Sequence, residues 1–151
     1  MNNETIDLET LKEFLEAKVD QYNKRDFIGS DPIQIPHSFT TKEDIEISGF
    51  LTATIAWGNR KSIIKNSRNL MDLMDNAPYE FITSHKQSDL KVFERFVHRT
   101  FNAQDTIQFI KSLNHIYNTY GGIEFIFLKY AETDSLQYLS LIHISEPTRP
   151  Y

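Results

Sequence analysis

Hydrophobic positions recur every three or four residues along most of this chain, which is the spacing of one face of an α-helix. The first such run places apolar side chains at Leu8, Leu11, Leu15, Val19 and Tyr22. The residues between them are mostly charged, and the Asp that precedes the run suits an N-cap. We therefore predict a half-buried first helix over residues 8–22.

A second run, residues 42–57, is apolar or small on every face. A helix of that kind is buried, so we expect it to be the central helix. Thr40 and Glu43 have the spacing of a capping box that would open it, and Gly58 would end it. Its small side would let a neighbouring helix approach closely.

The segment between these helices reads NKRDFIGSDPIQIPHSF. Its two prolines, Pro32 and Pro36, forbid a continuous helix, because the residue before a proline is pushed toward extended geometry. Long loops of this kind are often functional. The alternative, which we favour, is an extended wrap whose apolar side chains cover the core: Phe27, Ile33, Ile35 and Phe39.

The later helices have clear starts. Asn59 suits the N-cap of a helix whose apolar stripe ends at Met74, and Pro78 suits the first turn of the next one. A short helix should break near His98. Asn102 would then cap a long helix with a buried apolar face. This face consists of Phe109, Ile110, Leu113, Ile116, Tyr117 and Tyr120.

The final run, IEFIFLKYA, follows Gly121 and Gly122, which should stop the long helix. It is apolar on nearly every face, and no later segment would cover it. A large exposed apolar surface requires a partner. We therefore predict an all-α helical bundle that is incomplete, the N-terminal part of a larger helical domain.

The ending, LSLIHISEPTRPY, offers a second indication of truncation. It resembles the translation of a transposase sequencing adapter, whose codons give residues 139–149 in order and begin a proline codon next. Such segments are left out of fold reasoning. We expect residues 1–138 to be a helical domain fragment and residues 139–151 to be a non-native tail; the alternative is a native C-terminal strand.

Composition narrows the functional classes. The 151 residues are 40% hydrophobic and 25% charged, which fits a folded domain and argues against disorder. With no cysteine, disulfides and thiolate zinc sites are excluded. The chain shows no signal peptide, membrane span, phosphate-binding glycine loop or metal-ligand spacing, so we expect a cytoplasmic protein without a cofactor or metal. The net charge of −5 counts against nucleic acid, although a local basic face could bind phosphates.

The clearest local anomaly is Asn59-Arg60-Lys61, which puts two cations at the positive end of a helix dipole. Arg60 should project toward the core side of that helix. Lys61 falls on an arc with Lys65 and Arg68, where Arg68 can pair with an Asp four residues later. A helix N-terminus with an extra guanidinium is a natural anion site. The alternative, which we favour, is an arginine that tethers a neighbouring carboxylate or the end of the preceding helix.

Three further candidate site residues are two histidines and an arginine that adjoins one of them. His98 and Arg99 lie in a break between helices, so their side chains could converge on a cleft. A histidine beside an arginine should be neutral. His37 is the third candidate. For both histidines the simpler interpretation is a loop side chain that bonds to backbone.

Three stretches, DPIQIPH (31–37), AWGNRKSI (56–63) and HRTFN (98–102), followed by a helix and YGGIEFIF, resemble the bacterial family catalogued as domain of unknown function 2400. The resemblance covers about residues 8–130. It implies an all-helical fold related to the helix-hairpin-helix DNA glycosylases, with residues 42–57 as scaffold. The family's second half, with a Leu-Asp-x-His-Thr-like segment, the DNA-holding hairpin and a catalytic aspartate, would lie beyond this chain. No catalytic residue can be carried over, because the family has no established activity.

Three functional hypotheses follow. The first is a glycosylase-like protein that contacts nucleic acid through Arg60, Lys61, His98 and Arg99 and is inactive as this fragment. The second is a non-catalytic helical module whose final apolar helix docks a protein, including the missing half of its own domain. The third is an enzyme that acts on a small anionic substrate through His98 and Arg99.

Overall fold

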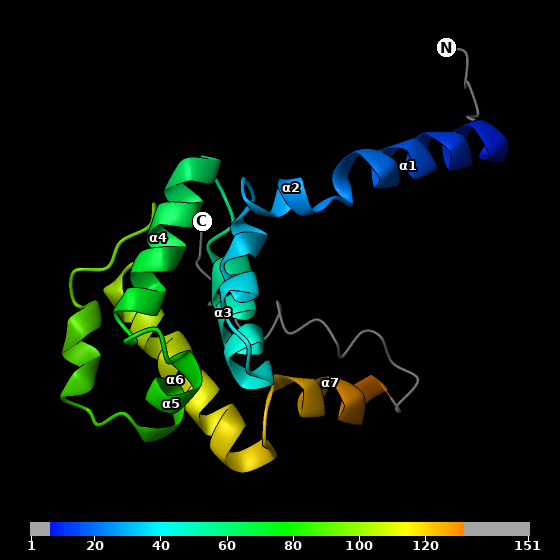
Figure 1. Cartoon of the computed structure of the whole chain (residues 1–151). Coiled ribbons are helices and arrows are strands. Elements are labelled where there is room, and N and C mark those ends of the chain that lie inside the picture. The colour runs from blue at the N-terminus through cyan, green and yellow to red at the C-terminus, as the bar shows by residue number, and fades with distance from the viewer. Residues whose placement is uncertain (1–6, 132–151) are drawn as a thin grey trace, which may run out of the picture.

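The computed structural model describes residues 7–131, and these are helical apart from loops and one isolated β-bridge between His98 and Phe101 (Figure 1). The all-α class predicted from the sequence is therefore confirmed. The α-helices are α1 Leu8–Tyr22, α2 Arg25–Ile28, α3 Lys42–Thr54, α4 Arg60–Asp72, α5 Pro78–Ser84, α6 Ala103–Tyr120 and α7 Ile123–Ala131. Three 3₁₀ turns are η1 Pro32–Gln34, η2 Pro36–Ser38 and η3 Asp89–Phe93. The predicted tail, residues 139–151, lies outside the described residues.

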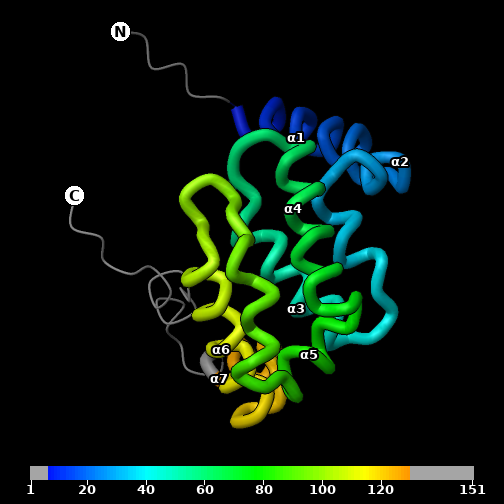
Figure 2. The backbone as a smooth tube through the Cα atoms, turned by 90° about the vertical axis from the view of Figure 1, so that its left-hand side faces the viewer, coloured from blue at the N-terminus to red at the C-terminus, as the bar shows by residue number. Residues whose placement is uncertain are grey.

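The core lies between α3, α4, α5 and α6, with η3 closing one side (Figure 2). Leucine and isoleucine side chains from α3, α5 and α6 meet there with Leu70 and Met71 of α4, Met74 just beyond that helix, and Phe93. Their exposed fractions are near zero, so this cluster holds the apolar surface that drives folding. The central position predicted for residues 42–57 is confirmed for α3.

The ends of α3 differ from the sequence prediction. The N-cap is Thr41, not Thr40, and the Thr41 hydroxyl donates to Asp44. The helix ends at Thr54, and Gly58, with φ +107°, lies beyond it in the turn to α4. α3 is also not buried on every face: Ile45 is 40% exposed, and on the small-residue side Ala53 is exposed while Ser48 and Thr52 are buried.

The 23–39 segment is neither a free loop nor a smooth extended wrap. It forms α2 and the two 3₁₀ turns, each proline opening a turn at N1 or N2. The wrap prediction is confirmed for Ile35, which is buried, and for Phe39, which packs on the core, whereas Ile33 is 45% exposed. A Cβ at Gly49 would lie 3.7 Å from Pro36 Cβ, so a proline, not a neighbouring helix, approaches the small side of α3.

α1 corrects a further prediction, because none of its residues is buried. It begins after Asp7 as predicted, although the Asp7 side chain makes no capping bond. The helix extends away from the body, at the far end from α6 and α7 (Figures 1 and 2). Its apolar stripe is exposed, from 81% at Leu8 to 39% at Leu11.

The later helix starts were predicted correctly. Asn59 accepts hydrogen bonds from the backbone N–H groups of Lys61 and Ser62. Asn102 and Asp105 form a full capping box at the start of α6, and Gly121 ends that helix in the left-handed conformation, with φ +83°. These local signals succeed because each depends only on residues within one turn of the cap.

α7 packs against α6 and is linked to α3 by an ion pair between Lys42 and Glu124. That hydrogen bond to Glu124 raises the pKa of Lys42 above its ordinary value. Phe125 and Leu128 of α7 remain more than half exposed. The exposed apolar face predicted for this helix is therefore confirmed.

The exposure of α1 has a direct consequence for stability. We expect the double substitution Leu11→Ser and Leu15→Ser to change the free energy of unfolding by no more than about 0.5 kcal/mol, as for other surface positions. Leu113→Ala in α6, where the side chain is 1% exposed, should cost about 2–5 kcal/mol. Urea unfolding followed by circular dichroism measures both. A comparable loss in the two variants would contradict the placement of α1.

Tyr117 of α6 donates its hydroxyl to Glu46 of α3 at 2.8 Å. Burial, and then the bond to Glu46, raise the pKa of Tyr117 above its ordinary value of about 10. The neutral phenol therefore stabilises the fold fully below about pH 10, and this contribution is lost as the pH rises further. We expect wild-type stability to fall relative to Tyr117→Phe by up to about 1.4 kcal/mol per pH unit above pH 10. Parallel stability curves for the two proteins would contradict this.

Candidate functional site

The turn from α3 to α4 is the point where the sequence candidates gather. Trp57 is 39% exposed here, and Gly58 follows with a φ that L-residues rarely adopt. Asn59 then caps α4 with its side chain. Since that side chain already occupies two N–H groups of the first turn, an anion at this helix end would have to be bound by side chains.

His98 is buried behind this turn, with an exposed fraction of 2%. Its Nε2 lies 3.2 Å from the carbonyl oxygen of Trp57 and its Nδ1 lies 2.7 Å from the amide nitrogen of Asn66. A carbonyl only accepts, so Nε2 carries the hydrogen, and Nδ1 accepts from Asn66. His98 and Arg99 do meet at the Trp57 ring, but His98 is buried and lines neither the groove nor the depression described below, so the predicted cleft is not seen. The simpler interpretation, a histidine bonding to backbone, is the one the structure supports.

Arg99 turns outward from the same hairpin. Backbone hydrogen bonds of 2.8 and 2.9 Å between His98 and Phe101 close the turn, and Arg99 occupies it with φ +58°. Its guanidinium carbon lies 5.2 Å from the centre of the Trp57 ring, a cation–π distance. The side chain also covers Gly58, where a Cβ would meet Arg99 Nη1 at 2.7 Å. A positively charged group is thus fixed beside an exposed aromatic ring.

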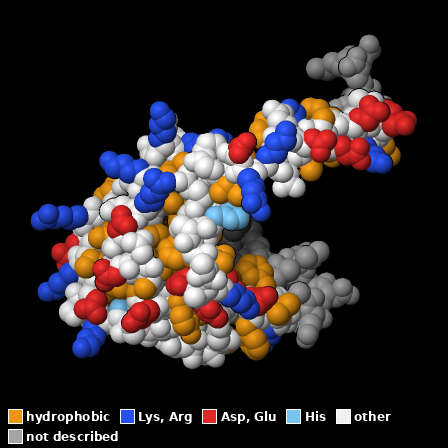
Figure 3. Space-filling view, viewed as in Figure 1, with side chains coloured by type: hydrophobic (Ala, Val, Ile, Leu, Met, Phe, Trp, Pro, Cys, Tyr) orange, Lys and Arg blue, Asp and Glu red, His pale blue; other side chains and the backbone are white. Residues whose placement is uncertain are grey.

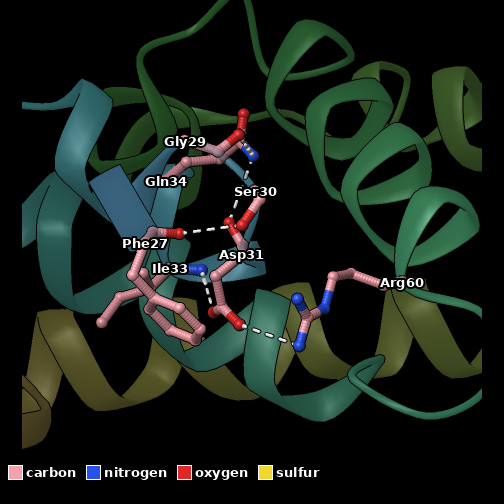
Figure 4. A network of polar contacts seen from close by, with 7 residues as sticks. All are labelled: Phe27, Gly29, Ser30, Asp31, Ile33, Gln34 and Arg60. Atoms are coloured by element: carbon pink, nitrogen blue, oxygen red, sulfur yellow. Dashed lines mark hydrogen bonds and ion pairs between the residues drawn. The ribbon is translucent and has the colours of Figure 1, made fainter. Parts of the chain in front are cut away.

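Arg60, the first residue of α4, faces the 27–34 segment (Figure 4). Its Nη2 lies 3.8 Å from Asp31 Oδ2, and its guanidinium carbon lies 5.8 Å from the centre of the Phe27 ring. The side chain is 57% exposed, so the predicted orientation toward the core is wrong. The tether to a neighbouring carboxylate, which the sequence left as the alternative, is the contact observed.

A groove of about 490 Å³ opens beside this pair. Its floor is the small-residue side of α3, and its opposite wall is the 31–36 segment, with Arg60 and Ile63 at one end. The volume falls within the range of small-molecule sites. Thr52 borders the floor, but its hydroxyl is buried away from the groove and has no hydrogen-bond partner within residues 7–131.

The outer face of α4 carries a row of cations, Lys61, Lys65 and Arg68, beside a shallow depression of about 770 Å³. Lys and Arg side chains gather along α4 in the space-filling view, whereas Asp and Glu gather on α1 (Figure 3). The expected ion pair between Arg68 and Asp72 does not form. Arg68 donates to the Gln34 side chain, and Asp72 accepts from Asn76.

The remaining candidate, His37, is exposed on η2 and lines neither the groove nor the depression. Three residues that the sequence did not single out do belong to the site: Asp31, Thr52 and Asn66. Asp31 had a recognisable signal, because its position before a proline suits the cap of η1, where it accepts from Ile33 N at 3.0 Å. Nothing local marks the other two, since their roles depend on tertiary contacts.

One side of the molecule, around α4, is thus formed by three stretches of the sequence: the turn DPIQIPH, the run AWGNRKSI and the first half of HRTFN. A family model described as "Protein of unknown function (DUF2400)" matches residues 31–146. The chain belongs to this family. Searches of curated proteins and of solved structures gave no match.

Metal-binding clusters and membrane-spanning helices can be assessed for residues 7–131. No group of three or more His, Asp or Glu side chains in this part of the chain is placed to hold a metal ion. No helix there is both long and apolar enough to cross a bilayer.

The geometry of the α3–α4 turn makes Gly58 sensitive to substitution. We expect Gly58→Ala to lower the free energy of unfolding by about 1–3 kcal/mol, because the positive φ strains any side chain. It should also displace Arg99 and change the fluorescence of Trp57, the one tryptophan of the sequence.

Gly29→Ala is the matched control. Gly29 has an ordinary φ of −62°, and a Cβ there would meet only a carbonyl at 3.9 Å. We expect this variant to be as stable as the wild type or slightly more stable. Equal losses in the two alanine variants, measured by thermal unfolding, would refute the special role of Gly58.

Proposed function

We propose that this domain binds nucleic acid through the cationic face of α4. The observation that carries the proposal is the row formed by Lys61, Lys65 and Arg68 at helical spacing. With a rise of 1.5 Å per residue the row extends over about 10 Å. Among the described residues that line this depression, three are cationic and one, Asp72, is acidic, so its lining is positively charged although the whole chain carries −5.

The neighbouring residues favour a polymer over a single phosphate. Arg99 adds a further exposed cation beside the turn that precedes α4. Trp57 is exposed under Arg99, and an aromatic ring beside cations is the usual platform for stacking an unpaired base. The charge of the α4 face would supply most of the affinity, and Trp57 would contribute only where a base is free to stack.

His98 has no part in this contact, because both of its ring nitrogens are occupied inside the fold. Its role in the proposal is to position Trp57 and the start of α4. A DNA glycosylase-like activity would require residues outside this site, and none of the side chains at the α4 face is arranged as an acid–base or nucleophile pair. The proposal is therefore limited to binding.

The salt dependence of binding tests the proposal. We expect the logarithm of the association constant for a labelled single-stranded oligonucleotide to fall linearly with the logarithm of salt concentration, with a slope of about −0.7 per phosphate neutralised. Replacing Lys61, Lys65 and Arg68 together by Gln should reduce the slope by about 2. Fluorescence anisotropy between about 50 and 200 mM salt measures this.

Lys12→Gln is the matched control, because Lys12 is an exposed cation on α1, away from α4. It should leave the slope unchanged. Binding that does not depend on salt, or a slope that Lys12→Gln changes as much as the triple variant does, would overturn the proposal.

A second candidate is a protein-binding module, and α1 favours it. Six apolar side chains along this helix are between 39% and 81% exposed, and the helix projects from the body (Figure 1). Contiguous apolar surface of this kind marks an interaction site. Salt-independent capture of a protein, lost in the Leu11→Ser and Leu15→Ser variant but not in the α4 triple variant, would support this function instead.

A further inference from the structure

The apolar stripe of α1 is left uncovered by the residues that the structure describes. Six apolar side chains along the helix are exposed, and none of its residues is buried. The last turn is anchored, because the Tyr22 and Phe27 rings meet edge-on with their centres 5.6 Å apart and Phe27 lies beside Arg60. The rest of the helix points away from the body (Figure 1). An apolar surface of this kind calls for a partner.

Acidic side chains follow one flank of this stripe. With 3.6 residues per turn, four of them project within an arc of about 60°, which begins about 100° from Leu15 at the centre of the stripe. All four are exposed, and they are Glu9, Glu13, Glu16 and Asp20. Glu16 forms an exposed ion pair with Lys12 at 3.8 Å. The surface that complements α1 must therefore be apolar, with cations along one side.

The α4 side of the molecule has this composition. α4 carries four cations and one acidic residue, whereas α1 carries four acidic residues and two cations (Figure 3). The row of cations on α4 borders a depression that adjoins the 29–36 segment. That segment presents Ile33, which is 45% exposed, and the groove on the same segment exposes Ala53 and Ala56. One chain thus carries both of two complementary surfaces.

We propose that α1 docks on the α4 side of a second copy of this chain. The apolar stripe covers Ile33 and the mouth of the groove, and the acidic flank faces the row of cations on α4. The opposite charges steer and orient the two copies, and the buried apolar surface adds to the affinity. This names a partner for α1, the helix behind the second candidate function, and it does not rest on nucleic-acid binding. Because both would use the same cations, a second copy and nucleic acid would compete for α4.

Pairing of two α1 helices fits the charges less well. In a two-fold antiparallel pair the same flank of each helix meets its counterpart, so the acidic flanks would face each other. Like charges placed side by side are destabilising. The α4 side of the second copy offers cations at the same position, and the observed charges therefore favour it.

The contact is small, because α1 has 15 residues and is about 22 Å long. Small interfaces give weak and transient complexes. We therefore expect a dissociation constant between about 10 μM and 1 mM for self-association. Ion pairs at its edge should make it weaker at about 500 mM salt than at about 50 mM.

Sedimentation velocity of the full chain, without nucleic acid, measures this association. An α1 variant, Glu13→Lys with Asp20→Lys, places cations opposite the row on α4. An α4 variant, Lys61→Glu with Lys65→Glu, places acids opposite the flank of α1. We expect each variant to associate at least about tenfold more weakly than the wild type, because each sets like charges against each other.

A mixture of the two variants is the sharpest test. Each reversed surface then meets its opposite on the other variant, so the mixture should associate about as tightly as the wild type. Recovery in a mixture requires a contact between molecules and not within one chain. The matched control for the α1 variant is Glu80→Lys with Glu94→Lys, which changes the net charge equally at exposed positions outside α1. It should not weaken association.

Three results would overturn the proposal. One is a wild-type chain that stays monomeric at about 1 mM and about 50 mM salt. Another is an α4 variant that associates like the wild type, which would assign α1 to a second α1 instead. The third is a mixture no tighter than its components. If the α1 variant loses helix, as circular dichroism would show, the α4 variant still decides. Failure of nucleic-acid binding alone would leave the self-association unaffected.

Discussion

The arrangement of the α4 side depends on one buried imidazole. His98 is bonded to the end of α3 through the carbonyl of Trp57 and to the middle of α4 through Asn66. It also begins the two-residue turn that carries Arg99. Burying an imidazole is costly unless its polar atoms are bonded, and here both ring nitrogens have partners. The end of α3 and the middle of α4 are therefore held to the distant 98–101 turn by a single side chain.

The positions of the charged groups follow from this connection. Once the Trp57 carbonyl is fixed, Gly58 must adopt its positive φ and Asn59 is brought to the start of α4. Arg60 then faces the 31–36 segment while Lys61 begins the outer row of cations. The groove and the cationic face both adjoin the 29–36 segment, which Arg60 contacts through Asp31 and Arg68 through Gln34.

The starts of the helices were predicted better than the burial of their faces. Caps such as Asn59 and Asn102 were predictable because the bonds that define them lie within one turn. The stripe of α1 was wrongly expected to be half-buried, since periodicity shows which face is apolar but not whether another element covers it. α3 was expected to run to residue 57, because its residues are apolar enough, yet the chain leaves the helix at Thr54 so that Trp57 can reach His98.

The sequence pointed to several residues of the site but not to the contacts that their side chains make. The unusual run Asn59-Arg60-Lys61 did point to the start of α4, but Arg60 faces Asp31 because of a tertiary contact with the proline-rich turn. The two neighbours His98 and Arg99 were expected in one cleft; both lie against the Trp57 ring, but His98 is buried and Arg99 is exposed. The role of His98 is tested most directly by its tautomer, measured by long-range ¹H–¹⁵N NMR at mildly alkaline pH. We expect a hydrogen on Nε2 and none on Nδ1; the opposite tautomer, or a ring N–H that exchanges freely with solvent, would contradict the arrangement.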